Sequence, residues 1–454
     1  MNKMKLSPIW IILVLIALVL GACAPASPAA VAPTQAPQNA GAVEQPTPAA
    51  TEPPAAASPA EKVTLNLISN WDAGSDPKGK VLQTIVQDFM AANPDIEIKV
   101  EIVPDTDMAT KIETSFLAKQ EPDIILHNWL GPSKDWLTDG VVIPVTPYLA
   151  EWGLEGKFKE NALGDFTVDS ELTAFPIEGF NWPIWYNTEI LDKAGVEDIP
   201  TTWAELTDAA QKIRAAGFQP FVIGGKDWTG GDWFLTAITA ALGNEQAAEL
   251  FANGGFSQNA GAKAFVEAFV QMRDAGVFAD NVEGLEFESM NAMFFEGKAA
   301  IVHAGSWSYA ELPEALQGKV RLGGIPLPPD AKGATKPFWY SSFEAKGLWI
   351  TRNGAEKLEA IQKFVQFFFQ DQYMVAFVEQ TAMVHPFTNL KYDESALSPL
   401  FVQSLNLDVD TVEHASVAWA PTNVFDAWYD VTANAFVPGT SAEDILQAMD
   451  DLYQ

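Results

Sequence analysis

Tryptophans stand beside small and polar residues at several points of this 454-residue sequence, a combination suited to binding a polyhydroxylated ligand. An indole offers a flat apolar face on which a sugar ring can stack, while carboxylates, amides and hydroxyls can hydrogen-bond the polar rim of the ring. The residues predicted to contact ligand are Trp71, Asp72, His127, Asn128, Trp129, Trp182, Trp228, Asp232, Trp233, Trp307, Trp339, Glu344 and Trp428. The chemistry that they indicate is binding rather than catalysis.

The tryptophans differ in how strongly their surroundings favour a ligand contact. Trp71, Trp129 and Trp307 each follow a predicted strand, and in an open α/β sheet the ligand crevice lies beyond the carboxyl ends of the strands. Trp203 stands in a helix-capping motif, which indicates a structural role. Packing roles are also expected for Trp136, Trp152, Trp185 and Trp349.

The carboxylates of the predicted set leave several interpretations open. Asp72, Asp232 and Glu344 could accept ligand hydroxyls, or they could be solvated or cap helices. Carboxylates between aromatic walls would also suit a polyamine or another cationic small molecule. A secreted glycoside-acting enzyme would need two carboxylates about 5 to 10 Å apart. Few Arg or Lys residues stand in the same loops, so an anionic ligand is disfavoured.

Motifs for catalysis and for metal binding are missing from the sequence. The four histidines are far apart, with no pair at metal-ligand spacing: His127, His303, His385 and His414. There is no G-x-S-x-G motif, and the sequence holds a single cysteine, so nucleophilic hydrolysis lacks its usual elements. We therefore expect no enzyme, no cofactor and no metal site.

Strand-like and helical patterns alternate along the first part of the globular sequence. They predict strands at 63–68, 96–103 and 123–126, with helices at 80–92 and 108–119 between them. This β-α-β-α-β order indicates an open and mostly parallel α/β sheet.

Two local features beyond this sheet are well defined. Residues 166–175 alternate around a polar turn and predict a β-hairpin. Thr202 and Glu205 form a capping box, and Gly217 is a natural stop, so a helix is predicted from Trp203 to Ala216.

The N-terminus has the pattern of a bacterial lipoprotein signal. Lys3 and Lys5 precede a short apolar run that ends in Leu20-Gly-Ala-Cys23, and Cys23 is the only cysteine of the chain. The run is too short for a comfortable membrane span, which needs about 20 apolar residues. Residues 1–23 are thus predicted to be a signal peptide with a lipobox, in which Cys23 is lipidated. Residues 24–61 are rich in Ala and Pro and predict a disordered linker.

The formal net charge of −32 argues against nucleic acid as a partner. It also argues against binding to an anionic membrane surface, apart from the lipid anchor. Without disulfides, stability must come from a large core. Nearly four hundred globular residues favour two domains over one. We expect a monomer.

Three stretches resemble the extracellular solute-binding proteins of ABC importers. The first runs from Tyr186-Asn187 through Lys193-Ala-Gly195 to Pro200-Thr-Thr-Trp-Ala-Glu-Leu206. The second is Phe294-Phe-Glu-Gly-Lys-Ala-Ala-Ile-Val-His-Ala-Gly-Ser-Trp307, and the third is Ile325-Pro-Leu-Pro-Pro329. Their order and spacing are similar to sugar-binding family 1, the maltose-binding-protein-like group, from about Val63 to the C-terminus.

The resemblance implies a two-lobed, Venus-flytrap α/β fold with discontinuous lobes. Lobe one would comprise residues 62–182 and 326–384, and lobe two residues 183–325 and 385–454, with a ligand cleft between them. The chain would cross at 181–186, 325–329 and 384–387. The implied function is the capture of a carbohydrate outside the cytoplasm, at the outer face of the cell membrane or in the periplasm. The implied partner is an ABC permease with its ATPase.

Overall fold

The computed structural model describes residues 62–128 and 131–454. These residues form two main β-sheets with helices packed on them, and each sheet belongs to its own hydrophobic core. This is the α/β architecture with two lobes that the sequence predicts. The predicted signal peptide, Cys23, the linker at 24–61 and Trp129 lie outside the described residues.

The first sheet has the strand order β2-β1-β3-β12-β6. It begins with β1 (Val63–Ser69), α1 (Pro77–Ala92), β2 (Ile96–Ile102), α2 (Asp105–Leu117) and β3 (Ile124–His127). Strand β1 is parallel to β2 and to β3, which confirms the predicted arrangement. Helix α1 begins three residues before its predicted start, because the Asp76 carboxylate accepts the Lys78 N–H at 2.8 Å and Pro77 fits the first turn.

The rest of this sheet comes from two distant parts of the chain. The predicted hairpin is confirmed as β4 (Thr167–Val168) and β5 (Glu171–Leu172), which turn through Asp169 and Ser170 at positive φ. Strand β6 (Phe175–Asn181) then pairs antiparallel with β12 (Ser341–Ile350). The other helices in this part are α3 (Thr146–Glu151), α4 (Glu160–Asp165), α11 (Leu358–Phe368) and α12 (Asp371–Thr381).

The second sheet has the order β10-β7-β9-β8. Its strands are β7 (Ile184–Asn187), β8 (Gln219–Val222), β9 (Ala299–His303) and β10 (Val320–Gly323). The helices of this part are α5 (Thr188–Ala194), α6 (Trp203–Ala215), α7 (Trp228–Leu242), α8 (Asn244–Asn253), α9 (Ala260–Asp274), α10 (Phe287–Phe295), α13 (Pro399–Leu405), α14 (Ala415–Ala418), α15 (Phe425–Phe436) and α16 (Ala442–Asp451). Helix α6 carries the predicted capping box of Thr202 and Glu205.

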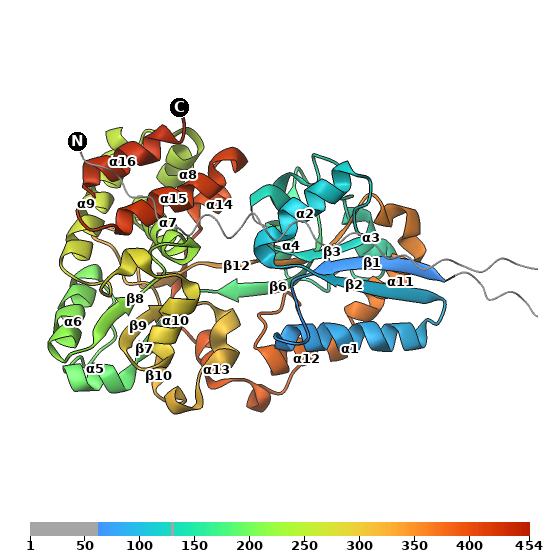
Figure 1. The fold of residues 1–454 in the computed structure, drawn as a ribbon, viewed down its shortest axis with the longest axis horizontal. Coiled ribbons are helices and arrows are strands. Elements are labelled where there is room, and N and C mark those ends of the chain that lie inside the picture. The colour runs from blue at the N-terminus through green and yellow to red at the C-terminus, as the bar shows by residue number, and fades with distance from the viewer. Residues whose placement is uncertain (1–61, 129–130) are drawn as a thin grey trace, which may run out of the picture. The chain divides into compact units, whose positions relative to one another are not determined.

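The chain passes between the two sheets three times. Strand β7 starts in the second sheet three residues after β6 ends in the first. Strand β12 brings the chain back beside β6, and the pair can be followed in Figure 1. Finally Val384 bridges Gly179 of β6, after which Leu397 and the C-terminal helices are buried in the second core.

The chain returns from the second sheet to the first later than at residues 325–329, where the sequence predicts this crossing. Ile325 and Phe338 exchange backbone hydrogen bonds at 2.6 and 3.1 Å, next to a short pair of β11 (Phe338–Trp339) and β13 (Asp410–Thr411). Ala334 and Phe338 are buried in the second core. Residues 326–338, which are predicted from the sequence to belong to lobe one, therefore pack with lobe two. The physical reason is that this loop satisfies its backbone polar groups on the second core.

No helix within 62–128 or 131–454 combines the length and the apolar character that a membrane span requires.

Candidate functional site

Aromatic side chains gather between the two cores. Phe180, Trp182 and Tyr340 form a small hydrophobic cluster of their own, and Trp307 packs against it. Phe180 lies in β6, Trp182 in the crossing to β7, Tyr340 just before β12, and Trp307 in a 3₁₀ turn after β9. The ring centroids of Phe180 and Tyr340 are 5.1 Å apart, and those of Trp182 and Trp307 are 5.0 Å apart. We call these four residues the junction cluster.

Two rings extend the junction cluster on the side of the second core. His303, the last residue of β9, stacks on Trp182 at 4.8 Å with planes 17° from parallel. Trp228, the first residue of α7, lies 5.3 Å from Trp182 and 6.1 Å from Trp307. Trp228 is 38% exposed, whereas Trp182 is 3% exposed and its buried Nε1 has no hydrogen-bond partner among the described residues. The cluster is therefore buried at Trp182, whereas the Trp228 indole beside it reaches solvent.

A buried carboxylate adjoins the junction cluster. The Tyr340 hydroxyl donates to Oε2 of Glu344 at 2.7 Å, and the Lys134 ammonium lies 3.9 Å from the other carboxylate oxygen. Burial raises the pKa of Glu344, and the positive charge of Lys134 opposes this shift. Glu344 thus combines a buried acceptor with an aromatic neighbour, which is the pairing that a sugar hydroxyl and ring require.

Lys134 and Asp165 tie this carboxylate to both lobes. The Lys134 ammonium donates to the Val417 carbonyl in α14, across the junction. Asp165 accepts the Phe343 N–H at 2.6 Å, and burial raises the pKa of Asp165. The Ser342 hydroxyl lies 3.0 Å from Asp165 and 3.1 Å from Glu344. Because a hydroxyl has a single proton to donate, the two carboxylates compete for it.

A hydrogen-bonded chain in the second lobe meets the cluster at Tyr340. The Tyr340 ring lies 5.4 Å from His414, whose Nε2 is 2.7 Å from Asp232. Asp232 also accepts the Tyr429 hydroxyl at 2.9 Å, and Ser416 Oγ lies 3.2 Å from His414 Nδ1. The order Ser416–His414–Asp232 has the elements of a nucleophile with its base, but Ser416 is only 1% exposed and offers no surface to a substrate.

Trp71 and Asp72, two predicted ligand contacts of the first lobe, follow β1 but differ in burial and in the contacts they make. Trp71 is 3% exposed, packs on Phe377 at 5.3 Å and has the Lys346 ammonium 5.6 Å from its ring centroid. Asp72 is exposed, and its carboxylate accepts the Gly74 N–H at 3.0 Å. Asp72 therefore shapes the turn before α1.

His127, the last residue of β3, and Asn128, which follows it, both contact Asp105 at the start of α2. His127 is buried, stacks on Trp136 at 5.7 Å and lies 3.3 Å from Asp105. The Asn128 amide donates to the same carboxylate at 3.0 Å. Burial lowers the pKa of His127.

Like Trp71, three further tryptophans of the predicted set lie apart from the junction cluster. Trp233 and Trp428 are fully buried in the second core, so their positions do not favour the predicted ligand contacts. An indole without exposed surface cannot stack on a ligand. Trp339 is half-buried, and its Nε1 donates to the Thr411 hydroxyl at 3.2 Å in the β11–β13 pair.

Sequence reasoning missed several residues that the fold brings to the junction: Phe180, Tyr340, Lys134, Asp165, His303, His414 and Tyr429. Tyr340 has a recognisable signal, because neighbouring residues of an extended segment point to opposite faces and Tyr340 therefore faces away from the side that Trp339 faces. The others come from separate elements, and no local pattern connects them.

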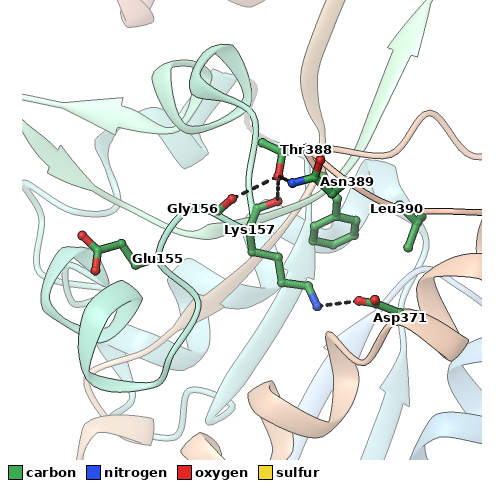
Figure 2. A pocket seen from close by; sticks show the side chains of 8 residues that line it. Glu155, Gly156, Lys157, Asp371, Thr388, Asn389 and Leu390 are labelled. Atoms are coloured by element: carbon green, nitrogen blue, oxygen red, sulfur yellow. Dashed lines mark hydrogen bonds and ion pairs between the residues drawn. The ribbon is translucent and has the colours of Figure 1, made fainter.

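Two surface hollows lie apart from the junction cluster. One, of about 240 Å³, is lined by Glu155, Gly156, Lys157, Asp371, Phe387, Thr388, Asn389 and Leu390. Figure 2 shows the Lys157 ammonium directed at Asp371, 2.9 Å away, while Glu155 points elsewhere. In the described part of the chain, no group of three His, Cys, Asp or Glu residues is arranged to hold a metal ion.

Burial of His303 predicts an acid-sensitive fold. Burial lowers the pKa of His303 from 6.5 to about 3, so between these values the unfolded chain takes up a proton that the folded chain does not. Stability should therefore fall as the pH falls through this range, by about 1.4 kcal/mol per pH unit from this residue. His303→Phe keeps a flat ring under Trp182 without the titrating group. Urea unfolding at pH 7, 5.5 and 4.5 should show a shallower loss for this variant, and equal slopes would contradict the prediction.

Known proteins resemble this chain over most of its length. The family model described as bacterial extracellular solute-binding protein matches residues 73–375. The crystal structure of a probable secreted solute-binding lipoprotein from Streptomyces coelicolor superimposes with a TM-score of 0.74 and 32% identity, and covers 86% of this chain and 98% of that chain. Maltose-bound MalE3 of T. maritima, at 19% identity, has a TM-score of 0.69 over 86% of this chain and 98% of that chain, and shows the fold alone. A maltotriose-binding protein of Pyrococcus abyssi is 25% identical over 291 residues, which are 64% of this chain and 59% of that protein.

Proposed function

Because this chain belongs to the family of bacterial extracellular solute-binding proteins, we propose that it captures a carbohydrate between its two lobes and delivers it to an ABC permease. The observation that carries the proposal is the junction cluster. Indoles from the β6–β7 crossing, from α7 and from the turn after β9 converge there beside the buried Glu344 carboxylate.

The chemistry of the junction favours a sugar over a purely apolar ligand. Trp228 and Trp307 keep exposed surface on which a ring can stack. Glu344 and Asp165 supply acceptors. Relatives named for maltotriose and for multiple sugars agree with this ligand class.

A cationic ligand such as a polyamine is the second candidate. Glu344, Asp165 and Asp232 lie near the junction, and burial raises the pKa of the first two although the positive charge of Lys134 opposes the shift. A net negative site with aromatic walls attracts ammonium groups. Catalysis is not proposed, because the Ser416–His414–Asp232 chain is buried.

A thermal-shift and calorimetry panel separates these candidates. Full-length protein is tested with maltotriose, xylotriose, chitotriose, raffinose, spermidine and amino acids. A ligand at 100 times its Kd should stabilise the folded state by about 2.7 kcal/mol. A carbohydrate hit supports the proposal, whereas spermidine alone would replace it with the cationic alternative.

Binding should also change the size of the protein. Because two lobes joined by crossing strands can close around a ligand, we expect a smaller radius of gyration by small-angle scattering when the sugar that binds is present. An unchanged radius at saturation would reject closure, although binding itself would stand.

Anchoring is proposed to pass through Cys23. Two acyl chains of a diacylglyceryl group hold a protein on a membrane, whereas one chain gives only marginal binding. The wild-type chain should therefore partition into the membrane fraction, and Cys23→Ser should stay uncleaved by the lipoprotein-specific peptidase or be released. Identical migration and fractionation of the two proteins would exclude lipidation at Cys23.

A further inference from the structure

The Trp307 indole lies directly against Gly305, and this contact depends on the missing Cβ of glycine. A Cβ at Gly305 would lie 2.2, 2.3 and 2.5 Å from three carbons of the Trp307 six-membered ring. Such distances are far inside van der Waals contact. The backbone of Gly305 has φ −77° and ψ 168°, an extended conformation that any residue adopts. Glycine is therefore needed here for the close approach of the indole and not for the backbone.

The position that Gly305 allows is also the position in which Trp307 meets its aromatic neighbours. The Trp307 ring is 5.0 Å from Trp182, 5.9 Å from Phe180 and 6.1 Å from Trp228. Because the obstructed atoms are at the far end of a side chain, a larger residue at 305 would displace the indole and leave the strand in place.

We propose that Gly305 is a positioning residue for ligand binding: it fixes the depth and the plane of the Trp307 indole in the junction cluster. The inference rests on the proposed function, since it takes Trp307 as a surface on which the sugar stacks. Residue 305 then sets how the Trp307 ring lies against Trp182, and with it the indole face that is offered to a sugar ring.

The test replaces Gly305 in the full chain. Gly305→Ala should bind the tightest sugar of the panel (maltotriose, xylotriose, chitotriose or raffinose) about tenfold more weakly, which is about 1.4 kcal/mol. Its melting temperature should stay close to that of the wild type. Its near-ultraviolet circular dichroism should change, because the coupled indoles of Trp307, Trp182 and Trp228 move apart. The matched control is Gly164→Ala in α4, where a Cβ meets nothing within 4 Å.

A double variant decides whether Gly305 acts through Trp307. Gly305→Ala/Trp307→Ala should bind like Trp307→Ala alone, because the collision has been removed. Wild-type affinity together with a wild-type spectrum for Gly305→Ala would overturn the proposal, and so would additive losses in the double variant. If Gly305→Ala does not fold, the double variant must fold, because it lacks the collision with Trp307. Failure of both variants to fold would overturn the proposal. If no sugar binds the wild type or any variant, the proposed function fails. The near-ultraviolet spectrum of Gly305→Ala still shows whether Gly305 sets the position of the Trp307 indole.

Discussion

Replacing Trp233 by alanine is expected to lower the free energy of unfolding by about 3 to 5 kcal/mol, the range for removing a large aromatic side chain from a core. Trp233 has no exposed surface, stacks on Trp203 at 5.7 Å and meets Phe278 edge-on at 5.7 Å. The cavity left behind cannot collapse easily among so many rigid rings. Urea unfolding measures the loss, and the affinity of the folded fraction for sugar should be nearly unchanged.

Trp228→Ala is the matched control, because it changes the same residue type five positions earlier in the same helix. Trp228 is 38% exposed and lies beside Trp182 and Trp307. This variant should lose affinity and keep most of its stability. If Trp233→Ala instead keeps its stability and loses affinity, the division between core and ligand-facing tryptophans is wrong.

Replacing Trp307 by alanine is expected to weaken sugar binding by about 1 to 3 kcal/mol, or roughly tenfold or more in Kd. Trp307 is half-buried, and its ring lies among Phe180, Trp182 and Trp228 without belonging to either main core. Removing it takes away a stacking surface and little of the core, so the melting temperature should change only slightly. Isothermal titration with the sugar that binds measures the effect.

Trp307→Phe tests whether a flat ring is what matters. It should retain more affinity than Trp307→Ala, because a phenyl ring still offers an apolar face. If both variants bind like the wild type while the sugar still binds, Trp307 is not a ligand contact. The family assignment would stand in that case, since it depends on the match over residues 73–375.

Much of the fold could be predicted from local patterns. The strands and helices at the start of the globular part, the 166–175 hairpin and helix α6 lie within a few residues of their predicted bounds. Each depends on interactions between near neighbours, such as the Thr202–Glu205 capping box. The second crossing was misplaced because the bridge between Ile325 and Phe338 joins residues that no local pattern relates.

The candidate site was only partly predictable, and α7 shows why. Nearly every residue of this helix is buried, so it lacks the polar face that would orient it in sequence. Trp228 and Trp233 are five residues apart and therefore point to different sides, but the sequence cannot tell which side is the junction. The packing of α7 on the second sheet makes Trp233 a core residue and leaves Trp228 at the junction.

The types of elements, their order and the aromatic and acidic character of the site follow from periodicity, capping and composition, and the resemblance to a binding-protein family follows from the order and spacing of three motifs. Which tryptophans contact one another depends on the tertiary structure. Phe180, Trp182, Trp228, Trp307 and Tyr340 come from four segments of the chain between residues 180 and 340. Their encounter depends on three crossings between two sheets, and such long-range contacts arise from the packing of whole elements and not from any local preference.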